Sequence, residues 1–285
     1  MGLFGFGKKK KNREAEAIAS QTEDMAKEDA QLDDESQQGD DAAAGERMTG
    51  QIPEETSMAY EGRGEEYGPW DIDEDNAPDF DEYMSLGAFY IPFVRGIQLR
   101  IKASRADNTL LGATVTIGRS SLELEAFAAP KTLGLWDDVR EDLLEGNANA
   151  KEVPGIFGAE IELPVKLDNG KVHTTRIVGV DGPRWMLRGI FSGPAAEDPK
   201  SPEAEILNRF FSDIVVDRGE EPLAPRDLIP MAPPLTPNER RERDAAQQDG
   251  EGAQLPGKPE GPFNSDQETE TKTTLSRGPM FSELR

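Results

Sequence analysis

Three charged residues stand close together in the sequence and carry side chains suited to binding an anion. Asp181 lies at a turn, and Arg184 and Arg188 are expected on one face of the strand that follows. Two arginines on one strand face can clamp a phosphate or a carboxylate through charge-assisted hydrogen bonds. They can equally pair with acids on a neighbouring strand, such as Glu160 or Glu162. Both interpretations stay open on the sequence alone.

Other groupings that could carry chemistry are not recognisable. His173 is the single histidine and falls mid-strand beside threonines, without the partners of a triad or a zinc site. The chain has no cysteine, which excludes disulfides and thiolate metal sites. The glycines from Gly179 to Gly182 lack the spacing of a nucleotide-binding loop. We therefore predict no catalytic residues, no metal and no cofactor.

The first thirteen residues combine apolar and basic side chains. The candidates for membrane contact are Leu3, Phe4, Phe6, Lys8, Lys9, Lys10 and Lys11. Apolar side chains can enter a bilayer while lysines meet anionic lipid, although three apolar residues give only reversible binding. The same bases can instead contact nucleic acid or the acidic part of the chain, or simply form a disordered start. Because the apolar residues precede the bases, the segment does not resemble a signal peptide, and we expect a cytoplasmic protein, with contact to the inner membrane face if this segment binds lipid.

Charge is distributed unevenly along the 285 residues, whose formal net charge is -24. Residues 14–82 hold 24 acids and 3 bases, whereas residues 83–230 hold 22 acids and 17 bases. The acidic stretch has few large apolar residues and cannot offset the entropy of ordering its backbone. The slightly acidic central part shows no basic stripe interleaved with aromatics, so no nucleic-acid partner is expected.

Hydrophobic periodicity is confined to the central part of the chain. The spacing predicts strands at 97–102, 115–117, 122–126, 161–167, 171–180, 185–191 and 214–216, and helices at 135–146 and 201–211. Asn169-Gly170 is typical of a two-residue hairpin turn between two of these strands. Pro164 cannot donate to a strand ladder, which places its strand at an edge or a bulge.

These elements predict an α+β fold. Their order, β-β-β-α-β-β-β-α-β, favours a mostly antiparallel sheet with two helices packed on it, because hairpins and short links join the strands. We expect one domain over residues 83–230. A disordered tail over 1–82, basic at its start and then acidic, precedes it, and a second disordered tail over 231–285 follows.

Several motifs of this chain are similar to an actinobacterial family known only as domain of unknown function 3710. The resemblance covers about Tyr67 to Met231, and its most specific part is the run from Val180 to Ala195, VDGPRWMLRGIFSGPA. The other matching motifs are AFAAP at 126–130, LWDDVR at 135–140, GPWD at 68–71 and PRD at 225–227. The family carries no activity to transfer. The resemblance does imply that Trp70 anchors the preceding segment on the core or on a partner, since a large amphipathic ring is a common contact anchor.

Three functions remain compatible with the sequence. The leading hypothesis is a non-enzymatic module that binds another protein while its acidic tails deter wrong partners. The second is a small-ligand or enzymatic domain that holds an anion with Asp181, Arg184 and Arg188. The third is a peripheral membrane adaptor tethered by residues 1–13.

Overall fold

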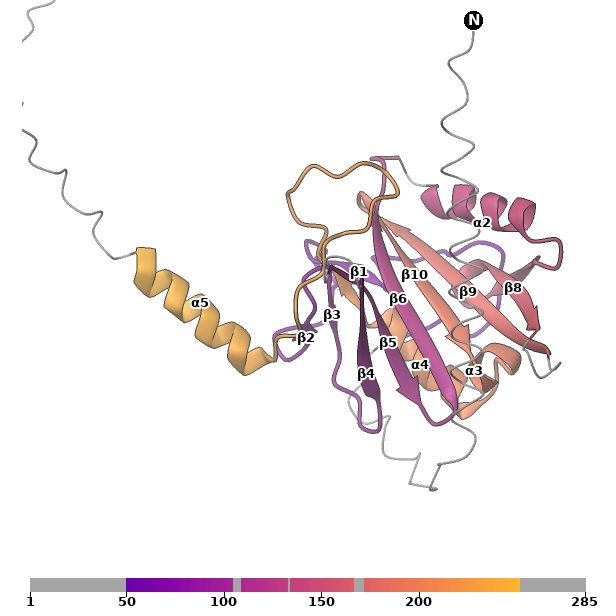
Figure 1. Cartoon of the computed structure of the whole chain (residues 1–285), viewed down its shortest axis with the longest axis horizontal. Helices are drawn as coiled ribbons and strands as arrows, with labels where there is room; N and C mark the ends of the chain where they lie inside the picture. Colours follow the sequence, from indigo (N-terminus) through magenta and orange to yellow (C-terminus); the bar gives the residue numbers. More distant parts are fainter. Residues whose placement is uncertain (1–49, 105–108, 133, 167–171, 252–285) are drawn as a thin grey trace, which may run out of the picture. The chain divides into compact units, whose positions relative to one another are not determined.

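The computed structural model describes residues 50–104, 109–132, 134–166 and 172–251, and its main feature is a seven-stranded sheet (Figure 1). The strands in spatial order are β4 (Gln98–Ala103), β5 (Leu110–Ile117), β6 (Ser120–Ala128), β10 (Trp185–Ser192), β9 (Val172–Gly182), β8 (Gly158–Lys166) and β7 (Lys151–Gly155). Each neighbouring pair is antiparallel. The expected α+β class with mostly antiparallel pairing is therefore confirmed.

A second, smaller sheet brings together strands from residues 70–91 and a strand at residues 215–216. Its strands in spatial order are β1 (Trp70–Asp71), β11 (Val215–Val216), β3 (Phe89–Ile91) and β2 (Met84–Ser85). β1 runs parallel to β11, whereas β11 with β3 and β3 with β2 are antiparallel. Strands this short leave no hydrophobic period, which explains why the sequence pattern did not reveal β1, β2 and β3.

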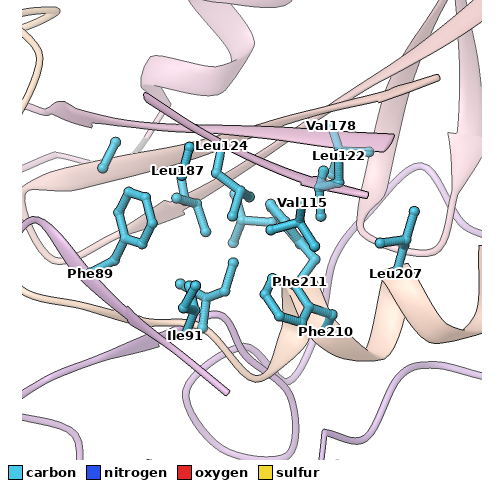
Figure 2. Packing of buried hydrophobic residues seen from close by; sticks show 14 of the residues in the cluster. Phe89, Ile91, Val115, Leu122, Leu124, Val178, Leu187, Leu207, Phe210 and Phe211 are labelled. Atoms are coloured by element: carbon cyan, nitrogen blue, oxygen red, sulfur yellow. The ribbon is translucent and has the colours of Figure 1, made fainter. Parts of the chain in front are cut away.

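Alternating residues give the large sheet two apolar faces. The helix α4 (Pro202–Ser212) covers one of them, and Figure 2 shows its Phe210 and Phe211 in one cluster with Leu124 and Leu187 of the sheet. The short helix α3 (Pro194–Glu197) joins the same cluster through two alanines. Each fully buried large side chain contributes roughly 1.5–3 kcal/mol relative to exposure. This cluster is the main core.

The opposite face packs against α2 (Leu135–Gly146). Trp136, Val139 and Leu143 contribute the helix side of this second cluster, and Ile161 and Ile177 contribute the sheet side. Strand alternation then assigns every second residue of β6 and β10 to each face. The predicted helix is confirmed, and the sheet is covered on both faces over part of its area.

Two charged groups are buried under α4. The guanidinium of Arg176 on β9 lies 3.1 Å from Glu160 on β8, and a further guanidinium nitrogen donates to Asn208 on α4. The guanidinium also lies 3.9 Å from the centre of the Phe191 ring. Burial lowers the pKa of Arg176, and the Glu160 carboxylate opposes that shift. This group ties α4 to the sheet at a fixed position.

Parts of both expected tails are structured. Residues 50–82 pack on the domain through β1, and through bonds from Arg209 and Ser212 to the backbone of residues 50 and 51. The helix α5 (Pro237–Glu251) lies in the other expected tail. The domain limits drawn at residues 83 and 230 are therefore too narrow, because backbone pairing and a few aromatic anchors order segments whose overall composition is polar.

The chain divides into two units, residues 1–242 and 243–285, and α5 begins in the first of them. At its start, Arg240 donates to the carbonyl oxygens of Phe80 and Asp81, and Arg241 pairs with Glu82. Thr236 and Glu239 exchange capping hydrogen bonds ahead of the helix.

Candidate functional site

The motif residues of the sequence gather at one end of the large sheet, around the turn between β9 and β10. Gly182 pairs with Trp185 across this turn, which contains Pro183 and Arg184 and is called the β9–β10 turn below. The end of β6, the start of α2 and the loop at residues 224–229 lie beside it, as the following bonds show.

Asp181 connects the hairpin to α2. Its carboxylate accepts hydrogen bonds from the backbone N–H of Gly134 at 3.2 Å and of Trp136 at 3.1 Å. The helix has no side-chain cap of its own, because its N-cap residue is Gly134. Asp181 therefore caps it from a distance in sequence. Burial raises the pKa of Asp181, and the two backbone hydrogen bonds partly oppose that shift.

Arg188 lies in the middle of β10 and is 3% exposed. It stands directly opposite Glu125 on β6 and forms an ion pair with it. Its guanidinium also lies 4.9 Å from the centre of the Phe127 ring. The pairing with Glu160 or Glu162 that the sequence suggested is wrong, since β6 and β9, not β8, are the neighbours of β10.

A second ion pair extends this group toward the edge of the sheet. Lys102 on β4 donates to Glu123 on β6 at 2.8 Å, and Glu123 is 2% exposed. Strand alternation puts both glutamates on the face that also carries Phe127. Burial raises the pKa of Glu123, and the nearby charge of Glu125 raises it further. The burial of these glutamates was not predicted from the sequence, although Phe127 on their face was a signal that this face is covered.

Arg184 has a different environment. It is exposed and its φ is 63°, so the residue sits in the left-handed region that non-glycine residues seldom adopt. Its carbonyl oxygen accepts a hydrogen bond from the N–H of Ala129 at 2.8 Å. Within the described ranges no side chain pairs with its guanidinium. The expectation that it shares a strand face with Arg188 is wrong, because β10 begins one residue later at Trp185.

Arg226 is the matching residue on the other side of β6. Its φ is 72°, and its N–H donates to the carbonyl of Ala128 at 2.8 Å. Its guanidinium binds Asp142 at 2.6 Å and lies 3.6 Å from Asp138, both on α2. Arg184 and Arg226 are the two non-glycine residues with positive φ in the described part of the chain. Two successive residues at the end of β6 hold their backbones: Ala128 accepts from Arg226, and Ala129 donates to Arg184.

Trp70 is not part of an exposed surface. It is 8% exposed and packs with Tyr83 and Val215. The next residue, Asp71, accepts a hydrogen bond from the indole N–H of Trp185, which is fully buried. The GPWD motif thus docks on the core. Its Asp71 also binds Trp185, the residue that follows the β9–β10 turn.

The remaining predicted groups take no part in the β9–β10 turn. The candidates for membrane contact, Leu3 to Lys11, lie outside the described residues. His173 is part-exposed, with its Nδ1 at 3.3 Å from Glu197. Over the described ranges no cluster of three or more metal-ligating side chains occurs. No helix there is long and apolar enough to cross a membrane.

The geometry separates the three residues of the predicted anion site. The Asp181 carboxylate serves α2 and the Arg188 guanidinium serves Glu125, so only Arg184 presents an uncommitted charge. Pro183 beside it is also exposed. The arrangement can offer one rigidly mounted arginine to another molecule.

Comparisons with known proteins identify the family and not an activity. A search of curated proteins found no match. The solution structure of cyanobacterial PsbP (CyanoP) from Synechocystis sp. PCC 6803 is similar at a TM-score of 0.29 and 14% identity, covering 48% of this chain and 94% of that one. A family model described as protein of unknown function (DUF3710) matches residues 68–240, from the GPWD motif to the first turn of α5. The chain therefore belongs to the DUF3710 family.

Proposed function

We propose that the protein is a non-enzymatic protein-interaction module and that the β9–β10 turn is the centre of its binding surface. The observation that carries the proposal is Arg184, an exposed arginine held in a left-handed conformation with no described side chain bound to it. The partner presents a carboxylate at this point, since a guanidinium binds carboxylates in a planar, two-pronged geometry.

The conformation of Arg184 has an energetic cost. A left-handed L-residue is about 1–2 kcal/mol less favourable than a right-handed one, and glycine avoids that cost. Strained residues persist where their surroundings determine them, and they cluster at ligand-binding positions. An arginine in this conformation therefore supports a role for its side chain.

The surroundings hold the turn firmly. Asp181 fixes one side of it to α2, Trp185 fixes the other side to Asp71, and Ala129 bonds the backbone of Arg184 itself. A rigid anchor loses little entropy on binding, and arginine is enriched among residues that dominate interface energy.

The acids at the start of α2 pair with other arginines and not with Arg184. Asp137 in the first turn of α2 pairs with Arg140, and Asp138 faces Arg226. These two acids at the start of α2 therefore have partners of their own, which leaves Arg184 for an external carboxylate.

Exchange of Arg184 for glycine tests the proposal. Full-length wild-type protein and Arg184→Gly are used to capture partners from extracts of the native host, and thermal unfolding is measured in parallel. We expect Arg184→Gly to keep or raise the unfolding temperature, because glycine relieves the strain, yet to lose a stoichiometric partner. A variant that binds the same partners as the wild type would contradict the proposal.

Arg119 provides a matched control, because it is an exposed arginine in the turn between β5 and β6 at the opposite end of the sheet. Arg119→Gly should keep the partner. Thermal unfolding with added phosphate or citrate covers the small-anion alternative, since a ligand that binds the folded state raises its stability. The cytoplasmic location belongs to the same proposal, and cell fractionation tests it.

A further inference from the structure

A groove that includes none of the motif residues around Arg184 lies between the segment at residues 78–83 and the start of α5. Its volume is about 730 Å³. The walls are mainly apolar, formed by Pro78, Pro92, Pro237, Tyr83 and Phe93. Phe93 is 43% exposed, which is unusual among the large apolar side chains of the described residues. A groove of this size and composition can take two or three apolar side chains of a peptide.

The rim of the groove is acidic. Asp79 and Glu82 line it directly. They belong to a run, residues 71–82, that contains seven acids and no base. Arg241 pairs with Glu82, and Arg240 lies 4.0 Å from the Asp81 carboxylate, whereas no described base pairs with Asp79, so its negative charge remains at the rim. The rim therefore favours a cationic ligand over an anionic one.

We propose that this groove binds the chain's own N-terminal segment, residues 3–13. The segment carries apolar side chains that fit the apolar walls and, directly after them, bases that fit the acidic rim. Leu3, Phe4 and Phe6 supply apolar side chains, and the run from Lys8 to Lys11 with Arg13 supplies five bases without an acid. The apolar residues enter the groove while the bases meet Asp79 and Glu82 at its rim.

The chain is long enough for this contact. Residues 14–49 separate the segment from Gly50, where the described structure begins. Thirty-six residues span about 120 Å when extended, and a flexible chain of that length has a mean end-to-end distance of about 30–35 Å. Tethering at such a length gives the segment an effective concentration on the order of millimolar.

The acidic residues between 14 and 49 are the competing site for the bases. They can neutralise the lysines, but they offer few large apolar side chains for Leu3, Phe4 and Phe6 to contact. The groove offers apolar contact and acidic charge together. A docked segment is withheld from an anionic membrane, so the groove regulates the availability of the basic, apolar end of the chain.

Disulfide trapping in the full-length chain tests the proposal, because the natural sequence contains no cysteine. One variant carries Phe4→Cys with Asn238→Cys at the groove. The control carries Phe4→Cys with Glu145→Cys on α2, which lines no part of the groove. We expect intramolecular cross-linking of the groove pair to be at least about tenfold faster than that of the control pair, as a docked geometry requires.

Two further variants sharpen the result. Replacing all four lysines, Lys8 to Lys11, by glutamate should reduce the groove cross-link to the control rate, and Phe93→Ala should reduce it in part. Equal rates for the two cysteine pairs would overturn the proposal. A cross-link formed only between two chains would also overturn it, because the occupant would then be a second copy.

Discussion

Arg184 and Arg188 are four residues apart in one hairpin, yet they belong to different physical environments. Arg188 is inside the sheet, where Glu125 neutralises its charge and Phe127 covers its plane. Arg184 is in the turn, where the backbone is strained and the side chain faces solvent. The charged side chain in the strand is bound inside the fold, whereas the fold fixes the backbone of the turn and leaves the Arg184 side chain exposed to solvent. Stability and binding are therefore expected to separate along this hairpin.

The largest effect is expected for Arg188→Ala. This change removes the guanidinium from a buried ion pair with Glu125, and breaking a buried pair typically costs about 3–5 kcal/mol of unfolding free energy. Chemical denaturation of the full-length chain measures the loss. The double variant Arg188→Met with Glu125→Leu removes both charges and should recover most of it. A loss below about 1 kcal/mol for Arg188→Ala would show that the strand does not depend on the pair.

A smaller effect is expected for Asp181→Ala, at the boundary between strand and turn. The change removes the acceptor for two N–H groups at the start of α2 and should cost about 1–2 kcal/mol. Asp181→Asn keeps one acceptor oxygen and should lose less. Hydrogen exchange at Trp136 should quicken in the alanine variant. If exchange there is unchanged, Asp181 does not cap the helix.

A pH-dependent effect is expected for Glu123→Gln, next to the Arg188 pair. The pKa of Glu123 is raised above its ordinary value of 4.5, so the folded protein binds this proton more tightly than the unfolded chain. The contribution of Glu123 is then most favourable at low pH and is lost as the pH rises through the raised pKa.

Unfolding free energies of wild type and Glu123→Gln, measured from about pH 4 to about pH 7, test this prediction. The stability of the glutamine variant relative to the wild type should increase along that range. Glu162→Gln, at a less buried glutamate on β8, serves as the control and should show a smaller change. A difference that is constant with pH would contradict the raised pKa.

The smallest effect on stability is expected in the turn itself. Arg184→Gly should change the unfolding free energy by less than about 1 kcal/mol, since relief of strain opposes the extra entropy of glycine in the unfolded chain. Arg184→Ala keeps the strain and should be slightly less stable than the glycine variant. A loss above about 2 kcal/mol for either variant would mean that Arg184 serves the fold.

Long elements with clear periodicity could be predicted from the sequence. The strands β8 and β9 pair as expected, and Ser201 caps α4, since its side chain accepts a hydrogen bond from the Ala204 N–H at 3.1 Å. Pro164 also has a simple explanation, because β7 pairs only with residues 158–162 of β8 and leaves an edge at the proline. Hydrophobic periodicity, a capping serine and a proline in a strand therefore suffice to predict these features.

The remaining features depend on contacts between distant segments. Nothing in the pattern around Asp181 shows that α2 starts within hydrogen-bonding distance of it. The partner of Arg188 depends on strand order, which alternation does not encode. The segment at residues 50–82 has a polar composition, and only Trp70 indicated that part of it docks. The sequence therefore draws attention to this hairpin, but it does not show which of its charged residues form pairs within the fold.

The parallel pair of β1 and β11 has a consequence for protein synthesis. Among the described strands, β1 forms ladder bonds with β11 alone, and the paired residues Trp70 and Val215 are 145 positions apart. At about 5–20 residues per second, the ribosome takes on the order of ten seconds to reach Val215 after Trp70. During that interval the GPWD motif has no strand to join, and Trp185, which bonds Asp71, is also made late. The nascent chain thus exposes its first anchor long before the site for it exists, and chaperones that shield tryptophan-containing segments have their best opportunity then.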